Sequence, residues 1–247
     1  MIMRDTYLVF RRQLAMSVRS PLWLVVGLVQ PVVYLVFFGP LLQGLDLGTD
    51  SWRVYIPGLL VQLALFGAAF VGFSVIAEVR SGVVERMRVT PVSRVALLLG
   101  RVLRDVLLLV GQSCVLLLVA VPFGLRAPIA GVALGVLLIA LLTASLAGLS
   151  YTIGLATRSE ESLAPLLNSV TVPLLLLSGI LLPMSLAPPW LDVVSRLTPL
   201  RYVVDGIRDA FLGQYATGDV LAGFLVAAGM AGATMAWGAH VFRREAA

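Results

Sequence analysis

Long uncharged, apolar stretches alternate with short charged segments along the whole sequence. Six of these stretches lack charge over at least the roughly 20 residues that a helix needs to cross a bilayer. They cover residues 22–45, 54–77, 106–125, 127–157, 162–191 and 220–242. The strict alternation of a membrane-spanning barrel is absent from them, so helices are the structure that satisfies their backbone polar groups in lipid. The pattern therefore predicts an all-α integral membrane protein with six transmembrane helices.

Two amphipathic segments lie outside these stretches. Within residues 4–19 the arginines occupy one helical face and Phe10, Leu14 and Val18 another, which predicts an amino-terminal interfacial helix. Prolines punctuate residues 183–219, and between them apolar residues recur with the i, i+3, i+4, i+7 spacing of a helix. The two repeats are Trp190, Val193, Val194 and Leu197, and then Leu200, Val203, Val204, Ile207 and Phe211. They predict two short amphipathic helices on the outer side, between spans five and six.

The arginines are distributed unevenly between alternate connecting segments. All 18 basic residues are arginine, and 13 of them lie in the two terminal segments and in the second and fourth loops. Basic residues concentrate on the cytoplasmic side of membrane proteins, so we expect a multi-pass plasma-membrane protein with both termini in the cytoplasm. The first apolar stretch is longer than the apolar region of a cleaved signal peptide, and we expect it to be retained. The absence of lysine favours a GC-rich genome, and we expect a bacterial source.

Composition excludes several other classes of protein. The chain is 60% hydrophobic and 13% charged, whereas about a quarter of the residues of a soluble domain are charged. Its net charge of +5 is explained by the cytoplasmic bias and does not indicate nucleic acid. One cysteine, Cys114, allows no intramolecular disulfide. The sequence contains no phosphate-binding loop and no metal-ligand spacing, so we expect no cofactor or metal on this chain and an energy source on a partner.

An intramembrane serine protease is one alternative, with Ser150 as nucleophile and His240 as base. The second glycine of the Gly-x-Ser-Gly turn is replaced by Tyr151. The two candidate residues also differ in depth by about 7 Å at 1.5 Å per residue, whereas a nucleophile and its base need contact at about 3 Å. We therefore expect Ser150 to pack between helices.

The second loop is the densest polar segment, and its first half is expected to form a short helix broken at Gly82 and ended by Pro91. Its motif, E-R-M-R-V-T-P-V-S-R-x-x-L-L-L-G-R-V-L-R within residues 84–104, resembles the loop of the type 2 permeases of ATP-binding-cassette exporters, especially the daunorubicin-resistance-like branch. Three further pieces agree, in order along the chain: Arg19-Ser-Pro21 with Pro31 and Phe38-Gly39, then Tyr55-Ile-Pro57-Gly58, then Ser178-Gly179 to Pro183 followed by Pro199-Leu-Arg-Tyr202-x-x-Asp205-x-x-Arg208.

This resemblance implies the partners and the coupling element. It implies a homodimer or a heterodimer of permeases with twelve spans, and separate nucleotide-binding ATPase subunits that hold ATP and Mg. It also implies that residues 4–19 form the connecting helix, that residues 78–91 hold the coupling helix, and that the pair after span five is an extracytoplasmic re-entrant cap. The implied ATPase-coupling residues are Glu78, Arg80, Glu85, Arg86, Arg88, Thr90 and Pro91.

Spans two and five carry candidate faces for a substrate path, because the resemblance implies that these two spans line it. In span two a polar residue and three aromatic rings follow each other at steps of 4, 4 and 3 residues, and in span five small polar groups recur at steps of 3 and 7 residues. The candidate residues are Gln62, Phe66, Phe70 and Phe73, with Asn168, Thr171 and Ser178. Lipid contact and interhelical packing are the alternative roles of these faces.

Together, the sequence pattern and the resemblance predict a permease subunit of an exporter that moves a hydrophobic or amphiphilic compound, such as a drug, an antibiotic or a lipid-like molecule. An apolar, aromatic path without buried charge suits such a compound better than an ion. The alternatives are a lipid-linked glycan export permease, the intramembrane protease, and a membrane-anchored scaffold. We expect one transmembrane domain over 1–247: interfacial helix 1–21, spans one and two 22–77, coupling loop 78–105, spans three to five 106–182, outer helices 183–219, and span six with its tail 220–247.

Overall fold

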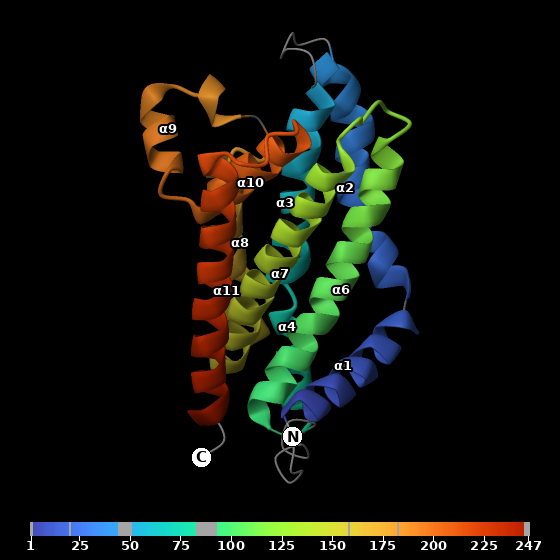
Figure 1. The fold of residues 1–247 in the computed structure, drawn as a ribbon. Coiled ribbons are helices and arrows are strands. Elements are labelled where there is room, and N and C mark those ends of the chain that lie inside the picture. Colours follow the sequence, from blue (N-terminus) through green and yellow to red (C-terminus); the bar gives the residue numbers. More distant parts are fainter. Residues whose placement is uncertain are drawn as a thin grey trace.

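The computed structural model describes residues 2–19, 21–43, 51–82, 93–157, 159–181 and 183–244, and within these ranges it is built from helices without strands. The helices pack side by side, most of them along a common direction (Figure 1). They are α1 (Ile2–Val18), α2 (Pro21–Gln43), α3 (Ser51–Ala69), α4 (Gly72–Arg80), α6 (Arg94–Ala120), α7 (Ile129–Thr157), α8 (Glu160–Leu177), a short 3-10 helix (Met184–Leu186), α9 (Pro189–Ser195), α10 (Pro199–Phe211) and α11 (Gly218–Arg244). The all-α prediction is confirmed.

Four stretches of the described chain are long and apolar enough to cross a membrane. They are Ser51–Arg80, Val95–Ala120, Ile129–Thr157 and Gly218–Phe242. Helices α2 and α8 correspond to the predicted spans one and five. The apolar stretch described in α2, Val25–Gly39, is shorter than the other four, and α8 begins with two glutamates. Length and composition thus support four of the predicted spans, and the count of six stays a prediction.

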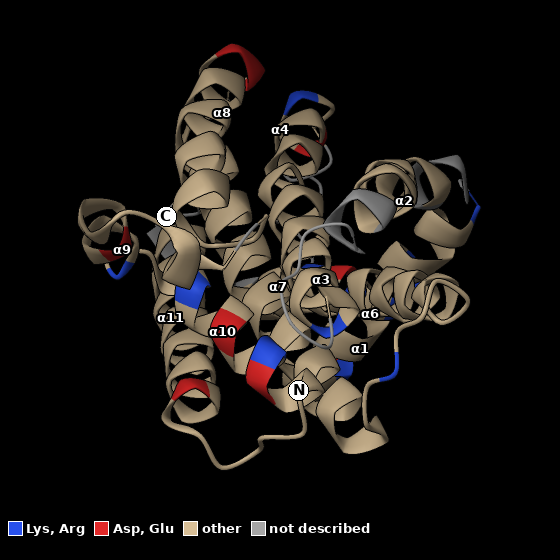
Figure 2. Cartoon of the chain, turned by 90° about the horizontal axis from the view of Figure 1, so that it is seen from above, with Lys and Arg blue, Asp and Glu red and all other residues tan. Residues whose placement is uncertain are grey.

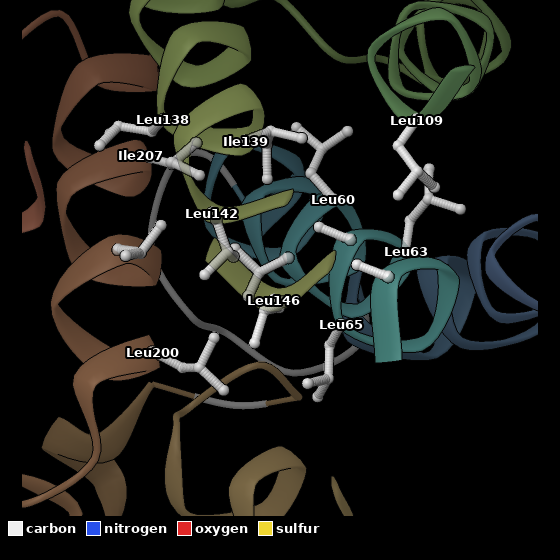
Figure 3. Close-up of a cluster of buried hydrophobic side chains, with 14 of the residues drawn as sticks. Leu60, Leu63, Leu65, Leu109, Leu138, Ile139, Leu142, Leu146, Leu200 and Ile207 are labelled. Carbon is white, nitrogen blue, oxygen red and sulfur yellow. The ribbon is translucent and has the colours of Figure 1, made fainter. Parts of the chain in front are cut away.

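The apolar core lies between α3, α7 and α10, and α6 closes one side of it. Leu60 of α3, Leu142 of α7 and Ile207 of α10 are fully buried in this core (Figure 3). A Cβ placed on Gly131 of α7 would lie only 2.0 Å from the carbonyl oxygen of Ala210 on α10. A side chain at this position would therefore force the two helices apart, which explains the glycine.

Helix α1 and the carboxyl-terminal end of α11 lie at one end of the bundle, and α9 and α10 lie at the other end (Figure 1). The predicted amino-terminal helix is present as α1, which packs along the first turns of α6. A Cβ on Gly100 of α6 would lie 2.7 Å from Val9 Cγ1, so glycine permits this close crossing. Arg4, Arg11 and Arg12 are exposed on α1.

The two helices predicted after span five are also present, as α9 and α10. The apolar repeat of α10 is buried, from Leu200 to Phe211. The repeat of α9 faces outward instead, with Trp190 67% exposed and Leu197 85% exposed. The polar side of α9 faces the protein because Arg201 of α10 donates hydrogen bonds to Ser195 and to the carbonyl oxygen of Asp192.

Helices α3 and α4 are interrupted at Phe70 and Val71, and Ser150 of α7 fills the interruption. The Gly72 N–H donates to Ser150 Oγ at 2.9 Å, and the Ser150 hydroxyl donates to the Ala69 carbonyl oxygen. Backbone groups freed by a break in a helix are costly inside a membrane unless they find such partners. Ser150 is therefore occupied in joining α7 to the two helices, and His240 is exposed on α11.

Candidate functional site

A buried polar cluster joins α1, α4, α6 and α7 near the end of the bundle that carries α1. Its four charged residues are two acids and two arginines, so its formal charge is zero. The members of this polar cluster are Gln13, Ser17, Glu78, Arg101, Arg104, Asp105 and Tyr151. Charges removed from water are tolerated when they are paired and hydrogen-bonded. Each charge in this cluster has an opposite charge beside it and at least one hydrogen bond.

One half of the polar cluster is an ion pair between α4 and α6. Arg101 Nη2 donates to Glu78 Oε2, and the side chains of the two residues are 4% and 23% exposed. Gln13 of α1 donates to the other oxygen of Glu78 at 3.5 Å. Within the described residues, Nε and Nη1 of Arg101 have no hydrogen-bond partner. The charge of Arg101 therefore depends chiefly on Glu78.

The other half of the polar cluster links α6 to α7 and α1. Arg104 Nε lies 3.0 Å from Asp105 Oδ1, and the Tyr151 hydroxyl donates to Asp105 Oδ2 at 2.6 Å. Arg104 also donates to the Tyr151 hydroxyl at 2.8 Å and to Ser17 Oγ at 3.0 Å. Arg104 and Asp105 thus form an ion pair, and both side chains bond to Tyr151 on the facing side of α7.

The polar cluster joins the two helices that flank residues 83–92, a range that lies within the predicted coupling loop of residues 78–105. Helix α4 ends at Arg80 just before this segment, and α6 begins at Arg94 just after it. Glu78 and Arg101 are one close link between these two helices. A force applied to the segment between them would reach both α6 and α7 through this cluster.

The predicted coupling residues fall into three groups. Glu78 is part of the polar cluster. Arg80 is exposed, and its Nη1 lies 3.4 Å from Oε1 of Glu160 at the start of α8. Figure 2 shows the positively charged end of α4 and the negatively charged end of α8. The remaining predicted residues lie outside the described residues: Glu85, Arg86, Arg88, Thr90 and Pro91.

Sequence reasoning missed the buried role of Arg101, Arg104 and Asp105. It assigned them to the coupling loop, because charges are rare inside membrane helices. The structure instead continues α6 through them from Arg94. Their spacing was the available signal, since positions 101, 104 and 105 share one face of a helix, and Tyr151 of span four is the distant partner that makes their burial tolerable.

A second charged cluster fixes α10 at the opposite end of the bundle. Arg208, 8% exposed at its side chain, donates to the carbonyl oxygens of Val54 at 3.0 Å and Gly179 at 2.6 Å, and to Asp205 Oδ1 at 3.2 Å. Burial lowers the pKa of Arg208 and raises the pKa of Asp205. Hydrogen bonds from Arg201 and then Arg196 lower the pKa of Asp192. Arg208 thus ties α10 to α3 and to the end of α8.

The structure separates the predicted face of span two into two parts. Gln62 and Phe66 line a small cavity against α2 and α6. Phe70 and Phe73 stack with ring centroids 6.1 Å apart and pack with Leu163 of α8 and its neighbours. The interruption at residues 70–71 causes this separation, because a continuous helical spacing no longer applies across it.

The predicted residues of span five are not gathered on one open face. Asn168 is exposed, whereas Thr171 is 3% exposed and Ser178 is fully buried. The Ser178 hydroxyl donates to the Leu175 carbonyl oxygen at 3.2 Å.

Among the described residues, no group of three or more His, Cys, Asp or Glu side chains could hold a metal ion.

Comparison with known proteins decides the family. The chain matches the ABC-2 type transporter family over residues 4–212, which is most of its length. It belongs to that family. The matched region includes both charged clusters and ends just beyond α10, so α11 follows it.

Curated relatives of this ABC-2 type chain carry the names of permeases. It is 32% identical over 197 residues to "Inner membrane transport permease YadH" of Escherichia coli K12, covering 75% of each chain. It is 25% identical over 214 residues to "Daunorubicin resistance ABC transporter permease protein DrrB1" of Streptomyces coeruleorubidus, covering 85% of this chain and 76% of the relative. It is 26% identical to "Putative transport permease ycf38" of Cyanophora paradoxa over 83% of this chain and 73% of the relative.

Proposed function

We propose that the chain is the permease subunit of an exporter that moves a hydrophobic or amphiphilic compound outward across the plasma membrane of a bacterium. Separate ATPase subunits bind ATP and Mg and act on the segment between α4 and α6. A second permease, either another copy or a sibling, completes the path. Similarity to a relative named for daunorubicin resistance supports a drug-like or lipid-like compound over a lipid-linked glycan.

The main support for this proposal is the buried polar cluster, because it joins residues from both sides of the segment 83–92. Glu78 precedes that segment and Arg101 follows it, and their ion pair links α4 to α6. Tyr151 extends the connection to α7. An ATPase that pushes on an intervening cytoplasmic segment would therefore shift three helices of the bundle. Such a link suits a transport subunit whose energy comes from outside the chain.

The proposal is tested by reconstitution of the chain with a candidate ATPase subunit from the same organism. The complete complex in liposomes is expected to move a fluorescent amphiphile only when ATP and Mg are both supplied on the cytoplasmic face. The permease alone and a complex with a hydrolysis-deficient ATPase are the controls. ATP-independent movement at the same rate would contradict the proposal, as would failure of the permease to associate with any such subunit.

The proposed orientation gives a separate prediction, which rests on the arginine asymmetry of the loops. In a variant without Cys114, single cysteines at Ser51 and Ala216 are expected to react with a membrane-impermeant maleimide added outside intact cells. A cysteine at Ser81 is expected to react only after the cells are opened. Labelling of the Ser81 position from outside would reverse the orientation and the side on which an ATPase could act.

A protease function has less support from the site. Both hydrogen bonds of Ser150 go to the backbone around the interruption between α3 and α4, so its hydroxyl is engaged in packing. A packing role predicts that Ser150→Ala lowers the stability of the fold, and a catalytic role predicts loss of activity without loss of stability.

A further inference from the structure

A small cavity lies between α2, α3 and α6, apart from both charged clusters. Its volume is about 140 Å³, and its walls carry Gln30, Gln62 and Gln112 among apolar neighbours such as Leu63 and Phe66. No residue lining it is charged. Val26 and Gln30 of α2, at its edge, are exposed, so the cavity can be reached from the surface of the chain.

Gln62 is the unusual residue in this cavity. It is 1% exposed, and neither its Nε2 nor its Oε1 has a hydrogen-bond partner among the described residues. It lies about 16 Å along the helix from Ser51 at 1.5 Å per residue, in the interior of the span Ser51–Arg80. A buried carboxamide without partners is destabilising, and this cost disappears when a ligand in the cavity supplies a donor and an acceptor.

The chemistry of the cavity restricts that ligand. A carboxamide offers both a donor and an acceptor, so it pairs with an amide, a carbonyl or a hydroxyl group. A charged group would lose its hydration here without finding an opposite charge. At about 30 Å³ per water molecule, the cavity holds a polar group and a few carbon atoms, which leaves the rest of an amphiphile outside, along α2.

We infer that this cavity binds the neutral hydrogen-bonding group of an amphiphile through Gln62, with Phe66 and Leu63 against its first carbon atoms. The assignment of this cavity to the transported compound rests on the proposed function. The ester carbonyl of a membrane lipid has the same chemistry and is the other source of such a group.

The test uses the substitution Gln62→Met, which keeps the length of the side chain and removes its hydrogen bonds. The full chain is placed in nanodiscs of ether-linked phosphatidylcholine, which has no ester carbonyl, and saturable binding of radiolabelled decanamide is measured. Loss of hydrogen bonds to a neutral group is expected to weaken this binding about tenfold. The variant is also expected to melt at a higher temperature without ligand, because an unpaired polar group has been removed.

Thr143→Val is the matched control. Thr143 on α7 is fully buried, its hydroxyl also lacks a partner within the described part of the chain, and it does not line the cavity. The control is expected to raise the melting temperature and to leave decanamide binding unchanged. Gly27→Ala is a second variant, since its new Cβ would lie 2.9 Å from Gln112 Nε2 and narrow the cavity without removing Gln62. It is expected to weaken binding as well.

The outcomes separate the two sources of the ligand. Equal decanamide affinity in ester-linked and ether-linked nanodiscs supports a transported compound, and a lower affinity in ester-linked nanodiscs supports a bound lipid. The inference is overturned if the Gln62→Met chain binds decanamide as tightly as the native chain does. It is also overturned if decyltrimethylammonium, a cation of the same chain length, displaces labelled decanamide as effectively as unlabelled decanamide does. Because no ATPase subunit is present, failure of this binding test is distinct from failure of the export test.

Discussion

Glu78→Gln is expected to uncouple ATP hydrolysis from export in the reconstituted complex. The substitution keeps the shape of the side chain and leaves the Arg101 guanidinium buried without its counter-charge. Loss of one partner of a buried ion pair typically costs about 3–5 kcal/mol, and the 23% exposure of Glu78 favours the lower end. Coupling between distant sites is typically worth 5- to 150-fold, so export per ATP hydrolysed is expected to fall by about that range.

Arg80→Gln is the control on the same helix end. Its ion pair with Glu160 is exposed, with side chains 56% and 45% accessible, and exposed pairs are typically worth about 0–1 kcal/mol. Because Arg80 is itself a predicted coupling residue, export per ATP is expected to fall, but by much less than in Glu78→Gln. The exchange of charges in Glu78→Arg with Arg101→Glu tests the pair itself, since it is expected to recover part of the lost export. Normal coupling in the single Glu78→Gln variant would show that the polar cluster does not transmit the force.

Arg208→Gln is expected to destabilise the end of the bundle that carries α10. The guanidinium is buried and donates to two backbone carbonyl oxygens and to Asp205, so its loss removes a donor from each of these acceptors, while Asp205 keeps its contact with Arg201. Removal of one member of a buried charged network typically costs about 3–5 kcal/mol. The melting temperature of the full chain in detergent is expected to fall accordingly, with a smaller folded yield.

The control for Arg208 is Arg196→Gln on the neighbouring polar side. Arg196 bonds Asp192 at 2.7 Å, but its side chain is 64% exposed, and Asp192 keeps its contact with Arg201. Water screens an exposed pair of this kind, so the melting temperature is expected to change little. A loss as large as that of Arg208→Gln would assign the stability to the surface charges of α9 instead.

Local pattern was sufficient for much of the fold. The uncharged stretches predicted α3 with α4, most of α6, α7 and α11, since a run of apolar residues of that length is stable in a bilayer only as a helix. Prolines at positions 189 and 199, favoured in the first turn of a helix, marked the starts of α9 and α10. Glycines at 131 and 135 of α7 then allow close contact with α10.

The candidate site was predictable only in part. Glu78 was identified from its place in a polar loop, and Gln62 from its place on an aromatic face. The role of each depends on a partner that lies elsewhere in the sequence. Arg101 is 23 residues from Glu78, and the cavity beside Gln62 is completed by α2 and α6. A spacing rule relates residues within one helix and contains no information about these contacts.

The sequence by itself determined which segments are helical and where most of them begin and end, because apolar length, proline positions and amphipathic spacing act locally. The tertiary structure decided the burial of charges in α6, the shape of the face of span two, and the orientation of α9. It buried Arg104 and Asp105 in α6, where Tyr151 forms hydrogen bonds with both. It broke the face of span two at residues 70–71, where Ser150 replaces the lost helical bonds. These outcomes depend on pairing between groups far apart in the chain, and burial of a polar group is favourable only once its partner is in place. For the same reason the apolar side of α9 faces outward, since Arg201 holds its polar side against α10.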